Sequence, residues 1–132
     1  MNLEGVFFDL DGTLADTAPD FQVVLNRLMR ETGRAEIAPE TIREQVSNGA
    51  GALVTLGFAV ERDEPEFDGY LEMLLARYRE HLDVETKLFP GMDRVLGHLE
   101  TRGIPWGVVT NKPERFTRPV LAGLGLLDRV AA

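Results

Sequence analysis

The chain reads Val6-Phe7-Phe8-Asp9-Leu10-Asp11-Gly12-Thr13-Leu14 close to its start, and this stretch decides how the rest is interpreted. Its first residues are apolar, with β-branched and aromatic side chains, and they predict a buried strand. Two carboxylates, a glycine and a hydroxyl follow at once in Asp9-Leu10-Asp11-Gly12-Thr13. Charged groups belong where a strand meets solvent, so the stretch predicts a polar site at a strand end.

The spacing of the two acids favours phosphate chemistry. Side chains alternate along a strand, so Asp9 and Asp11 are expected to point the same way, and a cation such as Mg²⁺ would relieve their repulsion. Gly12 would let backbone N–H groups approach a phosphate, and Thr13 adds a hydroxyl donor. One carboxylate could attack phosphorus while the other serves as proton donor and then base. On spacing alone, a solvated Asp-Gly turn is an equal alternative.

Composition narrows the class of protein. The 132 residues suit one domain, and 44% hydrophobic residues are enough for a core. The absence of cysteine excludes disulfides and zinc-thiolate sites. With 14 basic and 22 acidic residues the net charge is −8, which argues against nucleic acid as a partner. No apolar run is long enough for a bilayer and no signal-peptide pattern begins the chain, so we expect a cytoplasmic protein without a membrane partner.

The apolar pattern of the rest of the chain predicts several helices and a second strand. Helices are expected over 19–32, from Pro39, through 53–58, over 67–82, over 92–102 and after Pro113. The apolar run 104–109 predicts the second strand, and residues 129–132 are expected to begin a further one. Strand, crossover and strand in this order favour parallel pairing in an α/β sheet, with ligands at the carboxyl ends of the strands.

Two motifs carry a family resemblance. Phe8 to Leu14 with Asp16-Thr17 resembles the first motif of the haloacid dehalogenase (HAD) superfamily of phosphatases, and Gly107-Val108-Val109-Thr110-Asn111-Lys112-Pro113 resembles its second. Within that superfamily the chain is most similar to the phosphoglycolate phosphatase branch, especially the bacterial N-acetylmuramic acid 6-phosphate phosphatases. The stretches 17–21, 87–92 and 106–113 suggest this. The resemblance runs the full chain but covers only the first part of such an enzyme.

The resemblance implies an α/β architecture of two parts. The expected fold is a Rossmann-like parallel-sheet HAD core, incomplete here, with an inserted α-helical cap domain. Residues 1–15 and 86–132 would form the partial core, and residues 16–85 the cap. No strand pattern interrupts the helices of the inserted segment, so they can pack on one another in a layer of their own.

Site residues follow from the matched motifs. By resemblance Asp9 is the nucleophile and Asp11 the acid/base residue. Both are expected to bind Mg²⁺, Asp11 through its backbone carbonyl. Thr110 would hold the transferring phosphate with Asn111 beside it, and Gly12 and Thr13 would contribute to the same phosphate site. Helix capping is the alternative for Thr110 and Asn111, since such residues often precede a Pro-led helix.

Two further assignments concern the surroundings of the site. The turn at Ser47, Asn48 and Gly49 is our candidate for the substrate loop of the cap, although a plain helix–helix connection is the commoner meaning of such a turn. Lys112 is expected to be a surface lysine beside the pocket, because the catalytic lysine of the family lies on a later segment. That lysine and the acidic pair of the fourth family motif are not in this sequence.

The implied activity is that of a Mg²⁺-dependent phosphatase. The hydrolase would act through an aspartyl-phosphate on a small phosphorylated metabolite of carbohydrate metabolism, with N-acetylmuramic acid 6-phosphate favoured over 2-phosphoglycolate. The alternative is a catalytically inactive, truncated fragment that acts as a folded or domain-swapped interaction module. A sheet without a strand on one side would expose an edge, so a homodimer through that edge is the expected protein partner.

Overall fold

The computed structural model describes residues 3–82 and 84–131. Its parallel sheet consists of β1 (Val6–Phe8) and β4 (Trp106–Val108), with Val6 opposite Trp106 and Phe8 opposite Val108. Within the described residues β4 is the only strand that pairs with β1. The parallel pairing of strands this far apart in sequence confirms the expected α/β fold class.

A second, antiparallel pair connects the strands to the helices. It consists of β2 (Ala15–Asp16) and β3 (Lys87–Leu88), with Ala15 opposite Leu88. The sequence did not predict this pair, because two-residue strands have no periodic pattern to recognise. The chain therefore leaves and re-enters the sheet region through two adjacent segments.

Every expected helix is present. Among the described residues between β2 and β3 there are four α-helices and one short 3₁₀ helix: α1 (Ala18–Glu31), α2 (Pro39–Gln45), η1 (Val46–Asn48), α3 (Ala50–Phe58) and α4 (Phe67–Arg79). Two more follow, α5 (Met92–Thr101) and α6 (Glu114–Gly123). The predicted strand at 129–132 is wrong over 129–131, because Arg129 N bonds back to Leu126 O in a turn. Ala132 lies outside the described residues.

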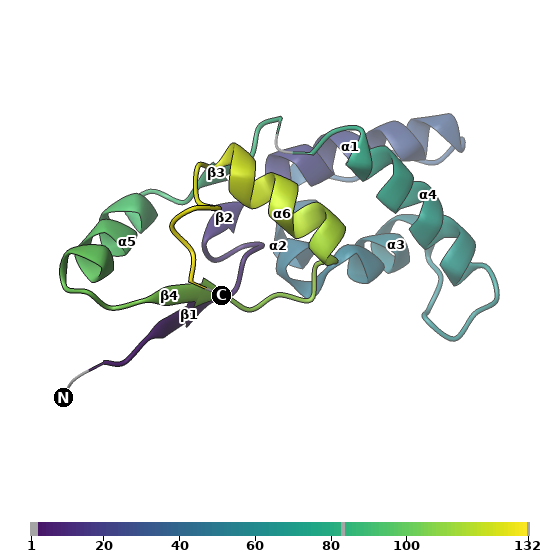
Figure 1. Cartoon of the computed structure of the whole chain (residues 1–132). Helices are drawn as coiled ribbons and strands as arrows, with labels where there is room; N and C mark the ends of the chain where they lie inside the picture. Colours follow the sequence, from purple (N-terminus) through teal and green to yellow (C-terminus); the bar gives the residue numbers. More distant parts are fainter. Residues whose placement is uncertain (1–2, 83, 132) are drawn as a thin grey trace.

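The helices pack around two apolar clusters. The helical cluster is formed mainly by α1 to α4, and its buried members include Phe21, Leu28, Ile42, Leu53, Leu74 and Tyr78. The sheet cluster includes Leu10, Leu14, Leu96, Trp106 and Leu126. Figure 1 shows α1 to α4 on one side of the molecule and β1, β4 and α5 on the other. Helix α6 contributes Phe116 to the helical cluster and Val120 to the sheet cluster, so it packs against both sides.

A buried carboxylate joins the beginning of the helical segment to its end. Asp20 in α1 is 0% exposed, and it accepts hydrogen bonds from Val84 N (3.1 Å), Glu85 N (2.8 Å) and Thr86 Oγ1 (2.5 Å). A buried charge is tolerated when such donors surround it. Asp20 therefore ties the first turn of α1 to the segment that leads into β3. No helix in residues 3–82 and 84–131 has the length and apolar character required to span a membrane.

Candidate active site at the ends of β1 and β4

A cavity of about 610 Å³ opens where β1 and β4 end. Its lining comes from three parts of the chain: the turn after β1, the helical segment from η1 to α4, and the loop between β4 and α6. The predicted site residues that line it are Asp9, Asp11, Ser47, Asn48, Gly49, Thr110 and Asn111. The fold thus brings residues from the two ends of the chain, Asp9 and Asn111 among them, to the sheet edge where α/β proteins bind ligands.

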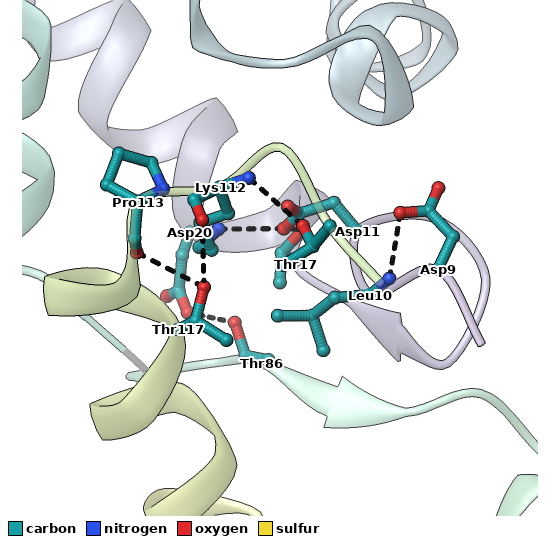
Figure 2. Close-up of polar contacts among 10 residues, drawn as sticks. Asp9, Leu10, Asp11, Thr17, Asp20, Thr86, Lys112, Pro113 and Thr117 are labelled. Carbon is teal, nitrogen blue, oxygen red and sulfur yellow. Dashed lines mark hydrogen bonds and ion pairs between the residues drawn. The ribbon is translucent and has the colours of Figure 1, made fainter. Parts of the chain in front are cut away.

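The two acidic residues have different environments. Asp9 is exposed, and its Oδ1 accepts a hydrogen bond from Leu10 N at 2.9 Å. Asp11 is only 9% exposed, and its Oδ1 accepts from both Thr17 Oγ1 (2.7 Å) and Lys112 Nζ (2.8 Å). Figure 2 shows Asp11 held between these two donors. Asp9 is the accessible carboxylate of the pair, and Asp11 is the fixed one.

Lys112 is buried, so the expectation of a surface lysine is wrong. Its side chain is 4% exposed, and Nζ lies 5.0 Å from the ring centroid of Phe21 and 4.6 Å from that of Tyr78. Burial lowers the pKa of Lys112, while the nearby charge of Asp11 opposes this shift. Lysines are seldom buried without a partner. This partner could not be recognised from the sequence, because Asp11 is distant along the chain.

Thr110 and Asn111 lie at the start of the β4–α6 loop. Thr110 Oγ1 accepts a hydrogen bond from Lys112 N at 3.1 Å. Pro113 occupies the position before α6, without a side-chain cap, so Thr110 does not cap this helix. A hydroxyl that accepts one bond can still donate another, which leaves Thr110 able to bind an anion in the cavity. Asn111 is exposed and lines the cavity beside it.

Gly12 and Thr13 lie outside the lining of this cavity. Their amides bond within the turn, Gly12 N to Ala15 O at 3.0 Å and Thr13 N to Leu10 O at 3.4 Å. Gly12 has φ +83°, and a Cβ there would lie 3.0 Å from Ser47 Cβ. Glycine at this position therefore lets the turn approach the helical segment closely. The roles of Gly12 and Thr13 in phosphate binding stay predictions.

The predicted substrate loop is an ordered turn. Ser47 and Asn48 belong to η1, and Gly49, with φ +91°, separates η1 from the first turn of α3. Gly49 N donates to Val46 O at 3.1 Å, and Asn48 Nδ2 to Gln45 Oε1 at 3.1 Å. All three predicted residues face the cavity that contains Asp9 and Asp11. Their contact with a substrate stays a prediction.

The donors in the cavity fit a weakly held Mg²⁺ ion. Mg²⁺ is commonly bound by one or two carboxylates, with water and substrate phosphate completing its shell. Asp9 is accessible, and the backbone carbonyl of Asp11 accepts no hydrogen bond from the described residues. No group of three or more acidic, histidine or cysteine residues that could hold a metal occurs in 3–82 and 84–131. Asp9 would therefore hold the ion through its carboxylate and Asp11 through its backbone carbonyl, with help from substrate.

Two residues that line the cavity, Arg62 and Tyr78, were not predicted as site residues from the sequence. Arg62 lines the cavity from the connection between α3 and α4, where the residues next to it in sequence are acidic. Tyr78 of α4 is 1% exposed, and it also contributes to the cavity wall. The basic residue in the run Glu61-Arg62-Asp63-Glu64 was the signal that could have drawn attention to Arg62.

Known proteins share both the sequence and the fold. The chain is 41% identical over 131 residues to an N-acetylmuramic acid 6-phosphate phosphatase from Pseudomonas putida. This alignment covers 99% of this chain and 59% of the relative. It is 38% identical over 126 residues to a phosphoglycolate phosphatase from Xanthomonas campestris pv. campestris, covering 96% of this chain and 57% of the relative. The chain therefore spans less than three fifths of the length of these relatives.

Solved structures agree with this relationship. A crystal structure of a predicted phosphoglycolate phosphatase from Haemophilus somnus matches with a TM-score of 0.80 at 26% identity, over 98% of this chain and 60% of that one. A haloacid dehalogenase-like hydrolase from Streptococcus pneumoniae matches with a TM-score of 0.82 at 20% identity, over 98% of this chain and 59% of that one, and supports the fold. The family model for haloacid dehalogenase-like hydrolases matches residues 6–131. The chain therefore belongs to the haloacid dehalogenase-like hydrolase family.

Proposed function

We propose that the protein is a phosphomonoester hydrolase that acts on a small phosphorylated metabolite. N-acetylmuramic acid 6-phosphate is the first candidate substrate and 2-phosphoglycolate the second, since relatives named for both activities align with nearly the whole chain. One structural observation carries the proposal: the accessible carboxylate Asp9 shares a cavity with Thr110 and with the fixed carboxylate Asp11. These are the groups that transfer of a phosphoryl group to a carboxylate requires.

The proposed reaction has two steps. A carboxylate oxygen of Asp9 attacks phosphorus, and the bond from phosphorus to the substrate oxygen breaks, while Asp11 gives its proton to the leaving alcohol. Water then attacks the phosphorus of the aspartyl-phosphate and gives a proton to Asp11. This second step releases inorganic phosphate, restores Asp9 and returns Asp11 to its protonated form.

The surrounding residues position these groups. Thr17 and Lys112 both bind Oδ1 of Asp11, which leaves Oδ2 facing the reaction. Thr110 donates its hydroxyl hydrogen to a phosphoryl oxygen. Bound Mg²⁺ would neutralise part of the phosphate charge. The helical segment covers the cavity and limits the access of water, so residues 16–85 serve as the cap in this proposal.

The test is phosphate release with Mg²⁺ from both candidate substrates. Three proteins are compared: this chain, its Asp9→Asn variant and the longer Pseudomonas putida relative. We expect release by this chain and none by Asp9→Asn, because an amide oxygen is a poor nucleophile. Equal release by the chain and its variant would contradict the role of Asp9. Release by the relative alone would contradict the proposed activity of this chain and favour the alternative of a non-catalytic interaction module.

A further inference from the structure

Arg62 lines the cavity, and contacts with two neighbouring residues hold its side chain there. A Cβ atom on Gly51 would lie 2.6 Å from Arg62 Nη2 and 3.0 Å from its Cζ, so the guanidinium packs directly against the backbone of α3. On another side, Arg62 Cζ lies 5.7 Å from the ring centroid of Phe67. The side chain is exposed, and these contacts place its charged end at the cavity.

No acidic residue in the described part of the protein pairs with Arg62. The two basic residues that line the cavity are Arg62 and Lys112, and Lys112 is paired with Asp11. Arg62 makes no hydrogen bond or ion pair with any described residue, although acidic residues flank it in sequence. The nearby Glu64 instead accepts from Glu61 N at 3.1 Å. A protein of net charge −8 thus presents an uncompensated guanidinium to a cavity that we propose receives an anion.

The position of Arg62 separates it from the phosphate chemistry. Asp9 and Thr110 follow strands β1 and β4, whereas Arg62 belongs to the connection between α3 and α4 on the helical side of the molecule (Figure 1). A guanidinium presents paired N–H donors that match a carboxylate. The cavity, at about 610 Å³, also has room for a ligand much larger than a two-carbon acid.

We infer that Arg62 is a specificity-determining residue that binds a carboxylate of the substrate at the cap side of the cavity. This inference rests on the proposed function and narrows it to phosphomonoesters that are also carboxylic acids, with a phosphorylated sugar acid fitting best. N-acetylmuramic acid 6-phosphate has this chemistry, because its lactyl group carries a carboxylate apart from the phosphate. The charged loop that flanks Arg62 then discriminates against ligands with further negative groups.

The test compares two ligands that differ in one charge. Calorimetry measures the binding of N-acetylmuramic acid 6-phosphate and of its lactyl primary amide to the Asp9→Asn chain, in which turnover is blocked. We expect the acid to bind about tenfold more tightly than the amide, the ordinary effect of one charged hydrogen-bonded pair. Adding Arg62→Gln should remove this preference while the amide binds as before. Adding Arg79→Gln, which removes an exposed arginine outside the cavity, should leave the preference unchanged.

The outcomes separate the inference from the proposed function. Equal binding of acid and amide before Arg62 is changed, or a preference that survives Arg62→Gln, would overturn the role of Arg62 and leave the phosphate site standing. Failure of both ligands to bind the Asp9→Asn chain would overturn the proposed function and the inference together. Partial recovery of the preference in Arg62→Lys, which keeps the charge but not the paired donors, would support it further.

Discussion

Replacing Lys112 with methionine tests whether the buried ion pair organises the site. Methionine keeps an apolar stem against Phe21 and Tyr78 but removes the ammonium that lies 2.8 Å from Asp11 Oδ1. The Asp11 carboxylate would then remain buried with Thr17 as its one side-chain donor among the described residues. Breaking a buried pair on one side costs about 3 to 5 kcal/mol. Because Thr17 still donates and the cost of burying Lys112 disappears, we expect about 3 kcal/mol.

Chemical denaturation monitored by circular dichroism measures this loss. A reduction of about 3 kcal/mol corresponds to a fall of about 12 °C in melting temperature for a chain of this size. Lys87→Met is the matched control, because Lys87 is the other lysine of the sequence and is exposed, without an ion pair among the described residues. We expect that control to change the free energy of unfolding by less than about 0.5 kcal/mol.

The double variant Lys112→Met with Asp11→Asn separates pairing from packing. It removes the stranded carboxylate, so we expect it to be more stable than the sum of the two single losses by about 2 kcal/mol. Strictly additive losses, or a cost of Lys112→Met below about 1 kcal/mol, would refute the claim that this pair is a strong buried contact.

The same residue predicts a dependence on pH. Burial lowers the pKa of Lys112 in the folded protein, so between this lowered pKa and the ordinary lysine pKa of about 10.4 the unfolded chain binds more protons. The free energy of unfolding should therefore rise with pH from the lowered pKa toward that ordinary value, and fall as pH drops through the lowered pKa. Other groups also titrate in this range, so the contribution of Lys112 is the difference between the wild-type and Lys112→Met curves. A flat difference would contradict the buried position of Lys112.

The remaining predictions concern the frame around the site. Asp20→Ala should reduce the free energy of unfolding by about 3 kcal/mol in urea denaturation, since three donors lose their acceptor. A loss below about 1 kcal/mol would contradict the role of Asp20 in joining α1 to the segment before β3. Gly12→Ala should cost about 1 to 2 kcal/mol because of its φ of +83° and the contact with Ser47, whereas Gly97→Ala, inside α5 with open space around it, should be neutral or stabilising. Phe7, 66% exposed on β1, should promote the proposed self-association through this strand. Sedimentation should show dimers that Phe7→Lys weakens, and a monomer at every concentration would count against the homodimer.

The sequence predicted most of the helices because their information is local. The apolar spacing in α1, with Phe21, Leu25 and Leu28 on one face, and the proline before α2 are readable in a short window. The strand β1 and its acidic turn were also predicted, although the prediction that this strand is buried was wrong, since Phe7 is 66% exposed. By contrast, the pairing of β2 with β3 involves two residues on each strand, and no local pattern marks so short a ladder.

Part of the site was predicted because its residues also belong to local patterns in the sequence. Asp9, Asp11, Thr110 and Asn111 follow two strands, and the cavity contains all four. The environment of Lys112 could not be read from the sequence, because its burial depends on Asp11, Phe21 and Tyr78, which are distant along the chain. Arg62 was missed because acidic neighbours gave it the composition of a solvated loop. Long-range contacts distinguish Lys112 from an ordinary surface charge, and contacts with Gly51 and Phe67 distinguish Arg62.

The most direct test of the account is to identify the residue that carries the phosphoryl group during turnover. The chain is mixed with N-acetylmuramic acid 6-phosphate and Mg²⁺, quenched, and treated with borohydride, which reduces an acyl phosphate to the alcohol; the modified peptide is then located by mass spectrometry. We predict modification at Asp9 in the wild-type chain and none in Asp9→Asn. Phosphate release without modification of Asp9, or modification at another residue, would contradict the assignment of Asp9 as the nucleophile.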